Sequence, residues 1–182
     1  MSLTWRAGLA GLAVLAMTAH ASAQMPYAGM QTRPVKSLSD EQMADLRAGR
    51  GMGLALAAEL NGYPGPSHVL EHADALRLSD EQRSRVRALF DTMKAEAIPI
   101  GREVLARETE LDRAFADRTI TPERLTATIT AIGETQSRLR ATHLKFHLLT
   151  PAILTESQVR QYAELRGYAG GAHGHHQRHH PN

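Results

Sequence analysis

The chain has 182 residues, with 21 Lys and Arg against 19 Asp and Glu, which gives a net charge of +2. This near-neutral balance argues against a general nucleic-acid binder, which would carry a basic excess. The chain has no cysteine, so disulfides, thiolate metal sites and cysteine nucleophiles are excluded. The unusual count is ten histidines, which are mostly neutral at pH 7 and therefore hidden from the net charge.

The first 23 residues predict a cleavable export signal. One positive charge at Arg6 precedes an apolar run over 7–19, which is too short to span a bilayer comfortably. The small residues Ala21-Ser22-Ala23 then give the pattern that signal peptidase needs. We expect cleavage before Gln24 and a mature protein outside the cytoplasm. The alternative interpretation is an uncleaved membrane anchor.

Residues 24–66 predict an N-terminal extension with short helices. Ser39 and Gln42 form a capping-box pattern, which predicts a helix start. Glycines at 49, 51 and 53 interrupt that helix, and a second short helical turn is expected over 54–60. The segment 61–66 holds two prolines and two glycines, which predicts a firm break before the next element.

Residues 67–168 predict a helical hairpin domain. A helix is expected from Ser67, as its cap, through about Leu76. A second capping box at Ser79 then begins a long helix whose apolar residues recur every three or four positions. A turn over 117–121 leads into a second long helix with Pro122 at its first position. A third capping box at Thr155 begins the last helix, which we expect to end near Gly167.

The fold class expected from these elements is all-α, an antiparallel long-helix hairpin with short flanking helices. Strand patterns do not stand out anywhere in the mature sequence. Because one such hairpin has too little core to stand alone, we expect a homodimer that buries the remaining apolar face. Residues 169–182 are rich in Gly and His and have no apolar face, so we expect a disordered tail.

Four histidines of the mature chain outside the tail form two pairs with identical spacing. The pairs are His68 with His72 and His143 with His147. A spacing of four places two imidazoles on one face of a helix, where both can bind one ion. A folded hairpin brings the two pairs to the same end. Such a site would suit Zn, Ni, Co or Cu. The alternatives are a buried core histidine at 143 and solvated helix-start residues at 68 and 72.

A carboxylate partner and the tail complete the predicted ligand set. Glu71 lies between the first two histidines but is expected on a different face, so Asp91 is the better candidate, with a solvated surface acid as its alternative. Tail residues are expected to capture metal loosely, or else to form a passive polar tail. The tail histidines are His173, His175, His176, His179 and His180.

Enzyme activity has little support in the sequence. The nucleophile elbow, the phosphate-binding glycine loop and the HExxH pattern are all missing. We therefore expect a protein that is not an enzyme. The alternative is an enzyme with a hydrolytic zinc site, in which three histidines and a water bind the ion.

The helix-start motifs resemble those of the periplasmic CpxP/Spy/ZraP group, whose repeated sequence is Leu-Thr-x-x-Gln. The best match is Leu154, Thr155 and Gln158, and a near match is Leu78, Ser79 and Gln82. A third copy spans 38–42. The resemblance implies a dimeric, all-α periplasmic protein that acts as a chaperone or in envelope-stress and metal responses.

The histidine pairs narrow this resemblance. Residues 68–158 look like the CnrX-type periplasmic sensors of nickel and cobalt, which have His-x-x-x-His before the long helix and His-x-x-x-Met at the end of its partner. Here His147 takes the Met position, and the family's Glu ligand corresponds to the stretch around Asp91. The resemblance implies metal sensing or resistance, with a membrane signalling protein as a partner. The alternative is an ATP-independent refolding chaperone for unfolded envelope proteins.

Overall fold

The computed structural model describes residues 27–168, and these are all-helical, without a strand. The predicted signal peptide and the tail histidines lie outside the described residues. The elements are, in chain order, η1 (Met30–Thr32), α1 (Asp40–Ala48), α2 (Leu56–Glu59), α3 (Pro66–Glu71), α4 (Asp80–Ala116), α5 (Pro122–Leu149), η2 (Thr150–Ile153) and α6 (Glu156–Leu165). The expected all-α fold is confirmed.

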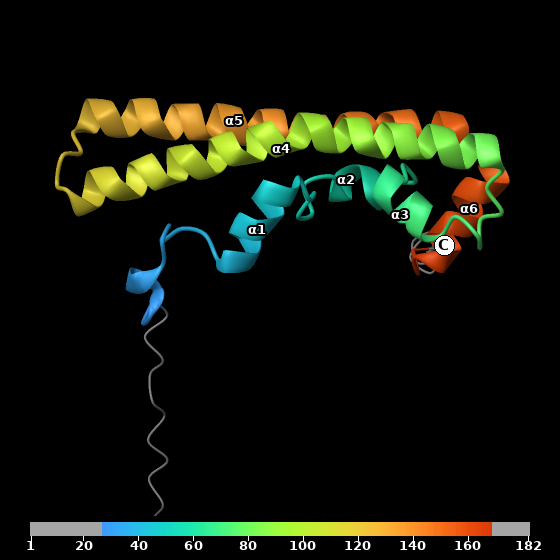
Figure 1. Ribbon diagram of the computed structural model, residues 1–182, viewed down its shortest axis with the longest axis horizontal. Helices are drawn as coiled ribbons and strands as arrows, with labels where there is room; N and C mark the ends of the chain where they lie inside the picture. Colours follow the sequence, from blue (N-terminus) through green and yellow to red (C-terminus); the bar gives the residue numbers. More distant parts are fainter. Residues whose placement is uncertain (1–26, 169–182) are drawn as a thin grey trace, which may run out of the picture.

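Two long helices, α4 and α5, form an antiparallel hairpin along the whole molecule (Figure 1). The turn between them spans 117–121, as predicted, and the Thr121 side chain caps α5 by accepting from the backbone N–H of Arg124. The shorter helices lie along one side of this hairpin (Figure 1). Over the described residues, none of these helices combines the length and the apolar character that a membrane span needs.

The core consists of two apolar clusters where the shorter helices meet the hairpin. One joins α1 to α4 and α5 through Leu46, Ala97, Val104 and Leu139. The other joins α3, the start of α4 and α6, with residues Val69, Ala73, Leu76, Leu78, Val86, Ile153 and Tyr162. These two clusters hold the shorter helices in fixed positions against the hairpin.

All three predicted capping boxes are present. Ser39, Ser79 and Thr155 each accept a hydrogen bond from the backbone N–H three residues on, and the glutamine there reaches back to the cap. Two of these glutamines also bind each other: Gln82 Nε2 donates to Gln158 Oε1 over 2.9 Å, and Gln158 Nε2 donates back over 3.0 Å. The start of α4 is thereby fixed to the start of α6.

Helix α3 differs from the prediction. It begins at Pro66, with Gly65 in extended conformation as its N-cap, so Ser67 is not the cap. It ends at Glu71 instead of continuing to about Leu76, and His72 is its C-cap. The physical reason is local: proline favours the first helical position because its missing N–H would have no partner there. The two predicted ligands of this segment therefore do not share one continuous helix face.

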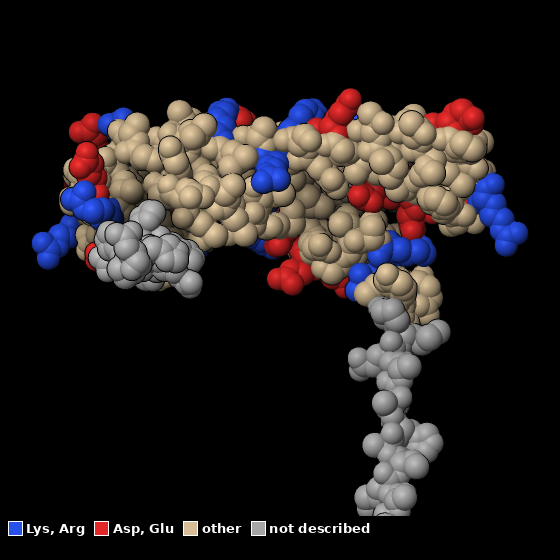
Figure 2. Space-filling view, turned by 180° about the vertical axis from the view of Figure 1, so that it is seen from behind, with Lys and Arg blue, Asp and Glu red and all other residues tan. Residues whose placement is uncertain are grey.

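The apolar stripe of the hairpin is buried unevenly. Val86, Met93 and Val104 are buried, but near the turn Phe115 is 54% exposed and Ile129 is 50% exposed. On the face seen in Figure 2, acidic and basic side chains alternate along the hairpin instead of gathering in one basic patch. The described part of the molecule thus leaves apolar surface uncovered at the turn end.

Candidate metal site

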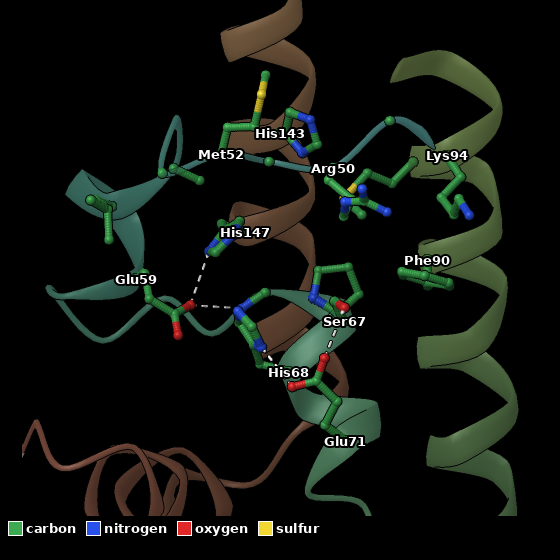
Figure 3. Close-up of a pocket in the computed structure, with 18 of the residues that line it drawn as sticks. Arg50, Met52, Glu59, Ser67, His68, Glu71, Phe90, Lys94, His143 and His147 are labelled. Atoms are coloured by element: carbon green, nitrogen blue, oxygen red, sulfur yellow. Dashed lines mark hydrogen bonds and ion pairs between the residues drawn. The ribbon is translucent and has the colours of Figure 1, made fainter. Parts of the chain in front are cut away.

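A cavity of about 530 Å³ opens between the hairpin and the segments that precede it. Its walls come from the loop after α1, from α3, from facing parts of α4 and α5, and from the chain just after α6. Three of the four predicted histidines, His68, His143 and His147, line it together (Figure 3). The fold brings His68 on α3 to the two histidines of α5, which come 75 and 79 positions later in the sequence.

His147 is held through one ring nitrogen, and its other ring nitrogen lies against Gly65, which is also part of the cavity wall. Its Nδ1 lies 2.7 Å from the backbone oxygen of Tyr63. A carbonyl only accepts, so Nδ1 carries the hydrogen and the Nε2 of the neutral ring keeps its lone pair. Nε2 faces Gly65, where an added Cβ would lie 2.5 Å from it. A backbone carbonyl on the far nitrogen is the usual arrangement of a metal-binding histidine.

His68 has the same arrangement with a carboxylate. Its Nδ1 lies 2.8 Å from Glu71 Oε2, and Ser67 donates to the other oxygen of Glu71 over 3.4 Å (Figure 3). The hydrogen bond from His68 lowers the pKa of Glu71 below its ordinary value. The carboxylate accepts from Nδ1 and so leaves Nε2 of a neutral His68 with its lone pair. Glu71 therefore shares a face with His68, contrary to the expectation from its position.

His143 is the buried member of the set. It is 2% exposed, and its Nε2 has no hydrogen-bond partner among the described residues. Burial, and secondly the charge of a protonated His147, lower its pKa, which keeps the ring neutral. A buried polar atom without a partner is uncommon in native structures. A neutral imidazole nitrogen is also the form that binds a transition metal.

Glu59 is a functional-site residue that the spacing analysis missed. It is 5% exposed, and its Oε2 lies 3.6 Å from His147 Nδ1 and 3.3 Å from the donating backbone N–H of Gly65. Its Oε1 accepts from the hydroxyls of Tyr162 and Tyr168 and lies 3.5 Å from Arg166 Nε. Burial and this carboxylate raise the pKa of Tyr162. The only signal in the sequence is one acid inside the apolar stretch 54–60.

Two predicted ligands lie elsewhere. The ring of His72 packs edge-on against Tyr162, with centroids 6.3 Å apart, and does not line the cavity. Asp91 is exposed on α4 and is absent from the cavity wall, although its neighbour Phe90 is part of that wall. Over residues 27–168, no three His, Asp or Glu side chains are close enough together to hold one ion. The histidines that line the cavity are an incomplete ligand set.

Of the comparisons with known proteins, the one with family models gives a match, to a family concerned with heavy metals. The profile of a family described as heavy-metal resistance matches residues 51–161, which include the hairpin, most of the cavity wall and most of α6. No curated protein and no solved structure matches the chain. Because the match covers more than half of the 182 residues, the chain belongs to the heavy-metal resistance family.

Proposed function

We propose that the protein is a periplasmic transition-metal-binding protein that acts in metal resistance or sensing. One observation carries this proposal: His68, His143 and His147 line one cavity, and the Nδ1 atoms of two of them are already engaged. These bonds orient each ring before an ion arrives, which lowers the cost of ordering the site. The predicted signal over 1–23 supplies the export that a periplasmic role needs.

The ligand chemistry restricts the metal. Imidazole nitrogen suits Zn, Cu, Ni and Co, whereas Ca and Mg prefer oxygen ligands. Without cysteine, the protein offers no thiolate that would select a softer ion. We propose binding of one divalent transition metal without catalysis, since no nucleophile motif accompanies these histidines in the sequence.

The proposal is tested by metal titration of the mature chain in a calorimeter. Wild-type protein should bind about one tight ion, and His68→Ala combined with His143→Ala should weaken that step at least tenfold, because two of the three imidazoles that line the cavity are removed. His72→Ala is the matched control: it removes a histidine of the same spacing pattern that packs on Tyr162, and should keep the tight step. An unchanged titration of the double variant would contradict the proposed site.

A second candidate function is an ATP-independent chaperone for unfolded envelope proteins. The exposed Phe115 and Ile129 near the turn favour it, because uncovered apolar side chains are what an unfolded client would contact. The same surface supports our proposal of a homodimer. Chaperone activity is distinguished from the metal-dependent role by suppression of client aggregation that persists in a chelator.

A further inference from the structure

The loop between α1 and α2 places a methionine beside the buried histidine of the cavity. This loop crosses the hairpin, because an added Cβ at Gly49 would lie 3.4 Å from the Cβ of Ala97 on α4. An added Cβ at Gly51 would lie 3.5 Å from His143 Nδ1 on α5. Met52 is the next residue and lines the cavity, where Figure 3 draws its thioether next to the His143 ring. A sulfur donor and an imidazole therefore share one end of the cavity.

A second methionine reaches the same cavity from α4. Met93 is 6% exposed and is part of the cavity wall. The ion pair between Lys145 and Glu96, with 2.7 Å between Nζ and Oε1, fixes the register of the two long helices. Because α4 and α5 are antiparallel, Met93 faces the last turns of α5, which carry the two histidines of that helix.

These two methionines add sulfur to a cavity that also holds an imidazole nitrogen without a partner. His143 Nε2 is buried and has no hydrogen-bond partner among the described residues. A thioether is a soft, polarizable donor, and thioether ligands select Cu⁺ over hard ions. Methionine also has three rotatable bonds, so both thioethers can adjust to an ion that binds His143.

Core packing does not explain a methionine at position 52. The Met52 side chain is 39% exposed, and its backbone φ of +45° lies in the left-handed region that residues other than glycine rarely adopt. Glycine flanks it on both sides in the sequence and would adopt this conformation without strain. Residues held in such conformations are concentrated at functional sites. A role as a donor to an ion accounts for both the strain and the exposure.

The charges at this end of the cavity favour a singly charged ion. Lys94 and Arg50 lie at the end that holds His143 (Figure 3), and Arg50 is paired with Asp45 over 2.5 Å. The remaining carboxylates of the wall lie at the opposite end, where they contact the other two histidines. The His143 end therefore carries a net positive charge, which repels a divalent ion more strongly than a monovalent one.

We propose that His143, Met52 and Met93 bind Cu⁺ at this end of the cavity. The inference goes beyond the proposed function, because it uses sulfur donors and a monovalent ion, whereas that function uses imidazoles and a divalent ion. The two share the cavity and His143. Met52 is the donor that solvent reaches, and the other two donors are buried.

The test uses Ag⁺ as the probe, because Ag⁺ has the ligand preferences of Cu⁺ and is not oxidised to a divalent ion in air. The mature chain, titrated in chloride-free buffer, should show a tight step. Met52→Leu combined with Met93→Leu should weaken this step at least tenfold, because leucine conserves the volume but has no sulfur. The Zn²⁺ titration of the same variant should be unchanged, which also shows that the variant folds.

Met43→Leu is the matched control. Met43 is 4% exposed in α1 and is not part of the cavity wall, so the same substitution there should leave the Ag⁺ step unchanged. Carbon-13 labelling of the methionine methyl groups gives a direct measurement. On adding Ag⁺, the resonances of Met52 and Met93 should shift before that of Met43.

The outcomes separate this inference from the proposed function. An Ag⁺ step that the double leucine variant keeps would overturn the inference, and so would an equal loss of Ag⁺ and Zn²⁺ binding. If wild-type protein binds Zn²⁺ tightly but not Ag⁺, only the inference fails. If it shows an Ag⁺ step that depends on the two methionines and no Zn²⁺ step, the inference is supported and the proposed divalent site is contradicted.

Discussion

At the scale of single residues, Gly65 determines how closely α3 can approach His147. It is buried, its N–H donates to Glu59, and an added Cβ would lie 2.5 Å from Nε2 and 2.6 Å from Cε1 of His147. Such distances are well inside van der Waals contact, so a methyl group here competes with the imidazole for the same space. The nitrogen proposed to bind metal is thus available only because position 65 has no side chain.

Gly65→Ala is therefore expected to displace the His147 ring. Because that ring is held by Tyr63, the displacement should weaken tight metal binding at least tenfold, about 1.4 kcal/mol, and lower the free energy of unfolding by about 1–3 kcal/mol. Calorimetric titration and urea unfolding measure the two effects.

Gly51→Ala is the matched control. Its Cβ would lie 3.5 Å from His143 Nδ1, an ordinary contact, and should leave the affinity unchanged. Equal affinities for the Gly65 and Gly51 variants would show that the His147 nitrogen is not used.

Individual residues also show which parts of the site could be predicted from the sequence and which could not. The repeated spacing drew attention to the three histidines that line the cavity, His68 on α3 and the neighbours His143 and His147 on α5. It also selected His72, whose ring lies on Tyr162 of a distant helix. Glu59 escaped detection because its partners are 103 and 109 positions away, and no local pattern encodes such a contact.

At the scale of elements, the helix boundaries were largely predictable because they depend on neighbouring residues. Capping boxes and the proline after the turn act within four positions, so the sequence alone located the starts of α1, α4, α5 and α6. The contacts between elements were not predictable. Neither the Gln82–Gln158 amide pair nor the position of α1 on α4 has a local signal, since both depend on how the chain folds back.

The position of α1 depends on Gly101 in the middle of α4. A Cβ at Gly101 would lie 2.2 Å from the backbone oxygen of Leu46, which cannot move without displacing α1. Replacing a helical glycine by alanine normally stabilises a helix by up to about 1 kcal/mol. Here we expect Gly101→Ala to lower the free energy of unfolding by roughly 2 kcal/mol or more, because α1 must separate from α4.

Gly133→Ala on α5 is the control, because nothing lies within 4 Å of its added Cβ and the substitution should therefore raise the free energy of unfolding instead of lowering it. That variant should gain about 0.5–1 kcal/mol by removing backbone freedom from the unfolded chain. Urea unfolding of both variants gives the comparison. Stabilisation by both substitutions would mean that α1 does not pack on Gly101 in solution.

At the scale of the whole molecule, the shorter helices cover only part of the hairpin. Where α1, α3 and α6 contact it, the apolar stripe is buried, and near the turn Phe115, Leu125 and Ile129 remain 37–54% exposed. Exposed apolar side chains are common singly, but these three occupy the adjoining ends of the two long helices. The proposed homodimer would bury this end of the stripe against a second copy.

Phe115→Ser combined with Ile129→Ser is expected to weaken self-association at least tenfold, because burying large apolar side chains contributes about 1.5–3 kcal/mol each. Sedimentation equilibrium over a range of concentrations measures the dissociation constant. Leu60→Ser is the control: Leu60 is 57% exposed beyond α2, away from the turn end of the hairpin, and its loss should leave association unchanged. Equal association of all three proteins would place the interface elsewhere. Because Phe115 and Ile129 lie near the turn of the hairpin and His143 and His147 lie near the opposite end of α5, tight metal binding should survive the Phe115 and Ile129 substitutions if the ion is held within one chain.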